Sequence, residues 1–100
     1  MGQQPPDFMS HRESDDVAVA VRDVEPGAAT VGNLENDNRG PLEVRVPIPL
    51  GHKVALRPVE AGADVVEYGL RIGHATAAIR PGEHVHVHNV RSARWQASTV

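Results

Sequence analysis

The 100-residue chain contains no cysteine and only three aromatic side chains. Without cysteine it can form no disulfide and no thiolate metal site, and it has no thiol nucleophile. Because its apolar residues are mostly valine and alanine, we expect one small domain with a modest core. A pocket that encloses a substrate would use much of that core, which favours a site at an interface with another chain.

Charge and hydropathy exclude further classes of protein. The net charge is −3, and acidic and basic residues are mixed along the chain without the basic stripe that nucleic-acid binding requires. No apolar run approaches the ~20 residues of a membrane span, and the polar start lacks the features of a signal peptide. We therefore expect a cytoplasmic protein without a nucleic-acid or membrane partner.

The pattern of apolar residues predicts an all-β fold. No long segment carries a 3.6-residue apolar period, whereas short valine-rich runs alternate between Pro/Gly turns. An apolar residue stands three positions before a glycine in residues 24–27, 59–62 and 79–82, which we interpret as one turn used three times. The expected core segments are Val17–Val21, Val44–Val46, Val54–Leu56 and Val85–Val87.

Three regions are expected along the chain. Residues 1–10 contain Pro5-Pro6 among polar residues and predict a disordered lead-in. Residues 11–92 form the domain, and residues 93–100 form a tail. Trp95 in that tail is a large ring that could dock on a partner chain, because tryptophan is enriched at interface anchors.

The most distinctive stretch runs from Gly82 to Asn89 and contains three alternating histidines. A β-strand here would place His84, His86 and His88 in a row on one face, with the valines between them on the core side. Three interpretations remain open: a metal site, a site for a polar or anionic substrate, or a solvated strand face. Only neighbouring imidazoles could share an ion, because the outer two lie ~13 Å apart along a strand.

A second candidate segment is Gly51-His52-Lys53, which precedes another apolar run. The chain contains nine arginines and a single lysine, Lys53. This lysine is either a functional residue, where a compact titratable amine is needed, or an exposed structural lysine. Gly51 permits close backbone approach next to His52, which suits a ligand contact and equally suits a turn. We expect the fold to bring this segment and the histidine stretch together at one site.

These residues carry a family resemblance that covers residues 11 to 95. Four segments in this order resemble the N-terminal domain of the altronate and galactarate dehydratases: 16–20 (Asp-Val-Ala-Val-Ala), 51–56 (Gly-His-Lys-Val-Ala-Leu), 68–73 (Tyr-Gly-Leu-Arg-Ile-Gly) and 82–89 (Gly-Glu-His-Val-His-Val-His-Asn). The resemblance implies a small SAF-type β-clip domain with short strands. It further implies a separate small subunit, as in the similar (2R)-sulfolactate sulfo-lyases.

The resemblance also implies a function and a site. The chain would assist a large catalytic subunit in eliminating water from a sugar acid or a related α-hydroxy acid. The alternatives are a small subunit of a sulfolactate sulfo-lyase-type enzyme, which eliminates sulfite, or a non-catalytic anion- or sugar-binding module. A divalent metal, iron(II), would be held mostly by the large subunit. The site residues implied are His52, Lys53 and His86 for catalysis, His84, His88 and Asn89 for substrate binding, and His86 and His88 for metal.

Overall fold

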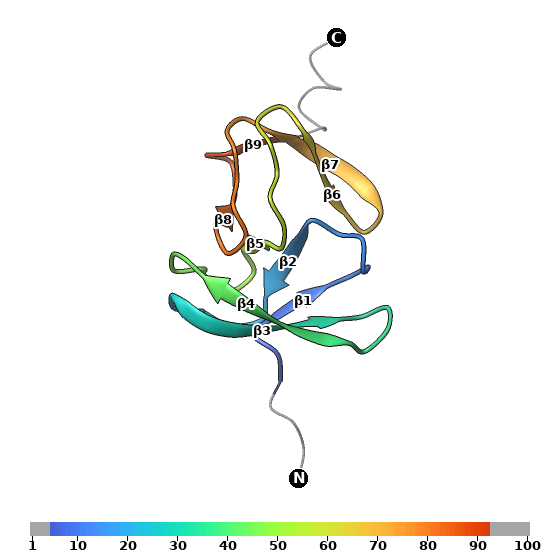
Figure 1. Cartoon of the computed structure of the whole chain (residues 1–100), viewed down its shortest axis with the longest axis vertical. Helices are drawn as coiled ribbons and strands as arrows, with labels where there is room; N and C mark the ends of the chain where they lie inside the picture. The colour runs from blue at the N-terminus through green and yellow to red at the C-terminus, as the bar shows by residue number, and fades with distance from the viewer. Residues whose placement is uncertain (1–4, 93–100) are drawn as a thin grey trace.

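A computed structural model of the chain describes residues 5–92, which form nine short strands and no helix (Figure 1). This confirms the all-β prediction. Among these residues there is accordingly no helix suited to cross a membrane. The strands are β1 Phe8–Ser10, β2 Val17–Ala20, β3 Gly27–Asn33, β4 Arg39–Val44, β5 Lys53–Ala55, β6 Asp64–Glu67, β7 Leu70–Ala75, β8 His84–Val85 and β9 Val90–Ser92.

The strands form two sheets. Six strands hydrogen-bond in the order β4-β3-β1-β2-β5-β8, and three in the order β6-β7-β9. In Figure 1, β1 to β4 occupy the lower part of the molecule, β6, β7 and β9 the upper part, and β5 and β8 lie between them. The short β8 is therefore an edge strand of the larger sheet, close to the smaller one.

The core is divided into two apolar clusters, and β2 and β5 contribute to both. Ala18 and Val54 belong to one cluster, which contains Phe8, whereas Val17 and Ala55 belong to the other, which contains Val85. Because successive side chains of a strand face opposite ways, β2 and β5 lie between the clusters and need apolar residues on both faces. This explains the Val-Ala-Val-Ala sequence of β2.

The predicted core is partly correct. Val17, Val44, Val54 and Val85 are buried, but Val21, Val46 and Val87 are 43%, 39% and 81% exposed. Each of these three follows the last residue of its strand by one or two positions, since β2, β4 and β8 end at Ala20, Val44 and Val85. Beyond a strand end the alternation of faces no longer applies, so the prediction is wrong there.

The predicted disordered lead-in is wrong for Phe8–Ser10. These residues form β1, which pairs antiparallel with β2 and parallel with β3. Phe8 is fully buried and is among the largest such side chains of the described residues. The burial of the one phenylalanine thus orders this segment despite its polar neighbours. Residues 1–4 and the tail with Trp95 lie outside the described residues.

The recurring turn is present at all three expected places. Its apolar residues Val24, Val59 and Ile79 are buried, and isolated β-bridges join Val24 to Ile48 and Val59 to Ile79. The glycine that ends each turn has a positive φ, 131° at residue 27 and 87° at residues 62 and 82. The three turns therefore share one conformational requirement that glycine meets without strain.

The buried carboxylate of Asp15 connects the loop after β1 to the turn between β6 and β7 through hydrogen bonds. Asp15 is fully buried and accepts backbone hydrogen bonds from His11, Arg12 and Gly69 at 3.1–3.3 Å. Burial acts to raise the pKa of this carboxyl, but backbone N–H donors, including that of Tyr68, outweigh it and lower the pKa.

We expect Asp15→Asn to destabilise the domain by about 1–3 kcal/mol at pH 7, because an amide replaces an acceptor-only carboxylate facing N–H groups. The folded-state pKa of Asp15 lies below its ordinary value of 3.8. The ionised carboxylate therefore stabilises the fold above pH 3.8, and this contribution is lost as the pH falls below that value. The free energy of unfolding is measured in urea at pH 7 and at pH 3. The difference in this free energy between wild type and variant should be smaller at pH 3. Asp64→Asn, at an exposed carboxylate paired with Arg71, is the control, and equal losses in both variants would contradict the assignment.

Candidate functional site: a histidine cluster

The pairing of β5 with β8 brings the two candidate segments together, as expected. The strands run antiparallel, with Lys53 opposite Val85 and Val54 opposite His84. His52 immediately precedes β5, and its backbone carbonyl accepts a hydrogen bond from Ala20 N at 2.8 Å. This position places the His52 ring beside the rings of the histidine stretch.

Three imidazoles meet at this point. His52 Nδ1 lies 2.9 Å from His84 Nε2, within hydrogen-bonding distance. The ring centroids of His52 and His86 are 4.7 Å apart, and those of His84 and His86 are 5.4 Å apart with nearly parallel planes. One ring nitrogen from each of the three residues can be chosen so that all lie within 4.8 Å of one another.

The expected row of three histidines on one strand face is wrong. β8 ends at Val85, and the amides of Asn89 and Val90 both donate to His86 O, so the chain turns. Asn89 holds this turn, because its Oδ1 accepts from His86 N at 3.0 Å and its Nδ2 donates to His84 O at 2.8 Å. Val87 consequently points to solvent instead of the core.

The turn also separates the two histidines predicted as a metal pair. His88 lies over His84, with ring centroids 5.4 Å apart, while His86 joins His84 and His52. The group of histidines with suitably close ring nitrogens in the described part of the chain therefore contains His52 and His84 with His86, and does not contain His88. Both polar ends of the Asn89 side chain are used within the loop, which gives this residue a structural task beside the predicted contact with substrate.

Lys53 has different partners from its neighbour His52. Lys53 Nζ is 3.5 Å from Glu67 Oε1, and the other oxygen of Glu67 is 3.7 Å from His11 Nε2. The Glu67 side chain is only 11% exposed, and the His11 ring stacks on Tyr68 with centroids 4.3 Å apart. Glu67 therefore orients the Lys53 side chain. Nothing in the sequence predicts this role, because His11 and Lys53, the two partners of Glu67, are distant from it along the chain.

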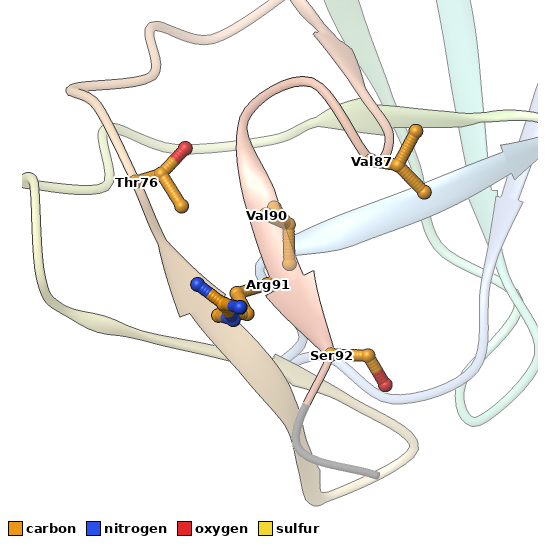
Figure 2. Close-up of a pocket in the computed structure, with 5 residues that line it drawn as sticks. All are labelled: Thr76, Val87, Val90, Arg91 and Ser92. Carbon is orange, nitrogen blue, oxygen red and sulfur yellow. The ribbon is translucent and has the colours of Figure 1, made fainter. Parts of the chain in front are cut away.

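Two members of the histidine cluster, His52 and His86, line an open groove of about 380 Å³ along the edge strand β8. Lys53 and Ile72 also line the groove, which extends past Val87 and Val90. Figure 2 shows the adjoining hollow, where Val87 stands on the loop before β9 and Thr76 faces the side chains of β9. The imidazoles of His52 and His86 are thus accessible from outside, beside apolar surface, as expected for a site completed by another molecule.

The electrostatic surroundings favour a neutral His84. Burial lowers the pKa of its imidazole, and the neighbouring imidazoles of His52, His88 and His86 lower it further, because a second positive charge would be repelled. A neutral imidazole has one free ring nitrogen. It can accept a proton or bind a metal ion, which a solvated imidazolium cannot do.

We expect the imidazole of His84 to titrate below its ordinary pKa of 6.5, and His52→Ala to raise the pKa towards that value by removing burial and one repelling charge. NMR titration of the histidine ring protons in chelator-treated protein measures both. His74→Ala, at a histidine of β7 outside the cluster, is the control and should leave the His84 titration in place. A His84 midpoint at or above 6.5 in the wild type would contradict this description of the cluster.

Comparison with known proteins agrees with the motifs. The altronate/galactarate dehydratase SAF domain matches residues 6–93. The (2R)-sulfolactate sulfo-lyase subunit alpha of Chromohalobacter salexigens is 42% identical over 91 residues, which cover 89% of this chain and 97% of that protein. The altronate dehydratases of Bacillus subtilis and Escherichia coli are 35% and 42% identical over 85% and 78% of this chain.

The relatives differ in how much of their own length is matched. The chain covers nearly all of the sulfo-lyase subunit, but only 16% and 15% of the two altronate dehydratases. In the dehydratases the same domain is therefore a small part of a much longer protein. Because the family match spans almost the whole sequence, this chain belongs to the altronate/galactarate dehydratase SAF domain family.

Proposed function

We propose that this chain is the small subunit of a two-subunit lyase that eliminates water from a sugar acid or a related α-hydroxy acid. The observation that carries the proposal is the cluster formed by the Gly51-His52-Lys53 segment and the histidine stretch. Two motifs distant in sequence are brought to one groove, where they offer titratable nitrogen atoms. The relation to a separately named lyase subunit of nearly equal length supports the two-chain arrangement.

Elimination of sulfite is the second candidate reaction. It is favoured by the 97% coverage of the (2R)-sulfolactate sulfo-lyase subunit alpha, which exceeds the coverage of any dehydratase considered above. In both reactions a base removes the proton on the α-carbon, and the water or sulfite leaves from the neighbouring β-carbon. The chemistry required of the small subunit is therefore the same in the two reactions.

The residues of this chain suit proton transfer and anion binding in such an elimination. A base must remove the proton α to the carboxylate, and an acid must assist the leaving group. The 2.9 Å contact between His52 and His84 lets a proton be shared between the two rings. His86, exposed on the loop, faces the groove and is the group we assign to proton exchange with the substrate. Lys53, oriented by Glu67, supplies a positive charge for the substrate carboxylate.

A divalent metal, iron(II) in this proposal, would stabilise the negative charge that develops on the substrate. The donor set fits such an ion, because imidazole nitrogens bind iron(II) and neighbouring metals well. The large subunit would hold most of its ligands and would cover the open groove. Covering the groove removes water from the charges and so strengthens their interactions with the substrate. The exposed Val87 beside His86 offers apolar surface for that contact.

We expect His86→Ala to lower kcat/KM of the reconstituted two-subunit enzyme at least ~100-fold, the scale of losing a general acid or base. Folding should be nearly unaffected, because exposed substitutions usually change stability by less than about 0.5 kcal/mol. The measurement is turnover of the mixture beside a thermal melt of the small chain, with His74→Ala as the matched histidine control. Unchanged turnover would show that the histidine is only solvated, and loss of folding together with turnover would make it structural.

The subunit assignment is tested by searching the adjacent reading frames for a large chain of the dehydratase type and adding that chain. We expect the two chains to copurify and to consume altronate, galactarate or sulfolactate only as a mixture, with sulfite release separating the two candidate reactions. Full activity of this chain alone would contradict the two-subunit proposal. Binding of a sugar acid without turnover in the mixture would favour a non-catalytic binding module.

A further inference from the structure

We propose that His52, His84 and His86 form a three-histidine site for a borderline divalent metal ion, carried by this chain itself and distinct from the ion that the large subunit would hold. In the metal-bound form His86 is a ligand and does not exchange protons with the substrate. The chosen ring nitrogens of these residues lie within 4.8 Å of one another. The Zn–N distance of ~2.0–2.1 Å requires nitrogens ~3.3 Å apart at a tetrahedral ion. The cluster therefore needs only small ring rotations to close on an ion, and His86 lies exposed on a loop, where its ring can turn.

The closest pair of nitrogens supports the same conclusion. His52 Nδ1 and His84 Nε2 are 2.9 Å apart, so a proton of one ring lies between them. An ion entering the cluster would take the place of that proton and separate the two nitrogens slightly. The displaced proton can move to the other nitrogen of its own ring, so both imidazoles stay neutral and each offers one nitrogen to the ion.

The backbone around the cluster holds the ligands in place before an ion arrives. His52 is fixed by its carbonyl's hydrogen bond from Ala20, and His84 by its pairing with Val54 in the sheet. Asn89 bonds the backbone of both His84 and His86. It acts on metal binding through the ligands that it positions and does not itself contribute a ligand atom.

The donor set selects the class of metal. The chain has no cysteine, and the group of three contains only imidazoles and no carboxylate. Imidazole nitrogens suit Zn²⁺, Co²⁺, Ni²⁺ and Fe²⁺, whereas Mg²⁺ and Ca²⁺ prefer oxygen ligands. Because His52 and His86 line the open groove, an ion held by the three histidines would keep a further position for water or for an oxygen atom of a small molecule.

This ligand set differs from the pair that the sequence predicts, and the difference is testable. His86 and His88 are two residues apart on the same exposed loop, so their alanine variants form a matched pair. In the structure His86 belongs to the group of three, while His88 contacts only the ring of His84 among the ring contacts of residues 5–92. Replacement of His86 should therefore weaken metal binding, and replacement of His88 should not.

The experiment uses the full chain without the large subunit, after treatment with a chelator. Zn²⁺ affinity is measured by titration calorimetry, and the visible absorption of bound Co²⁺ reports the coordination number. We expect one ion per chain and an ion-dependent rise in Tm. His52→Ala and His86→Ala should each weaken Zn²⁺ binding by ~100-fold or more, and Asn89→Ala by roughly 10-fold, the range for residues that orient ligands.

His74→Ala is the control and should bind Zn²⁺ like the wild type. Circular dichroism confirms folding, and His86→Ala, on the exposed loop, keeps the test decisive if the His52 variant is unstable. The proposal is overturned if the wild type binds no ion, if the affinity survives both His52→Ala and His86→Ala, or if His88→Ala abolishes binding while His52→Ala does not. Because no substrate or second chain is present, these outcomes are independent of the proposed lyase activity.

Discussion

The histidine cluster depends on the register between β5 and β8, and a single glycine secures that register. Gly82 N donates to Ala55 O, and Ala55 N donates to Glu83 O, both at 2.9 Å, so the turn before β8 is tied to the end of β5. A Cβ at residue 82 would collide with the backbone carbonyl of Glu43. A slip of one residue would move His84 to the other face of the sheet. The close approach of two backbones, possible only with glycine, therefore decides whether the two motifs meet.

Two kinds of chemistry stand next to each other on one short segment. His52 and Lys53 are adjacent, yet their side chains have different partners. His52 enters the cluster of imidazoles, where it adds to the effect of burial in lowering the pKa of His84. Lys53 instead lies beside the mostly buried carboxylate of Glu67, 3.5 Å from its Oε1. Both side chains nevertheless line the groove, so a bound molecule would meet nitrogen donors and a cation at separate places.

The sequence predicted the strand-rich fold and the meeting of the two motifs, but not the shape of the histidine stretch. The alternation of histidine and valine from residue 84 to residue 88 is that of a continuous strand. The turn that interrupts it is held by the Asn89 side chain, and asparagine is a residue that favours such local backbone bonds. β1 was missed for a different reason. Its apolar content is small, and the burial of Phe8 comes from parallel pairing with β3, a contact that local patterns do not encode.

The close packing of the imidazoles affects both the stability of the fold and the kind of ligand that the cluster can bind. Because the pKa of His84 is lowered in the folded domain, protonating this ring is less favourable in the folded domain than in the unfolded chain, and the domain loses stability as the pH falls below the ordinary value of 6.5. The fold thus opposes protonation of His84, while the backbone bonds of His52 and Asn89 keep the rings of the cluster together. An arrangement of pre-positioned ring nitrogens loses little conformational entropy on binding. It is suited to an incoming electron-pair acceptor, either a metal ion or the proton of an acid, and not to an anion that would need imidazolium partners. The positive charge for a substrate carboxylate must then come from Lys53 and from the molecule that covers the groove.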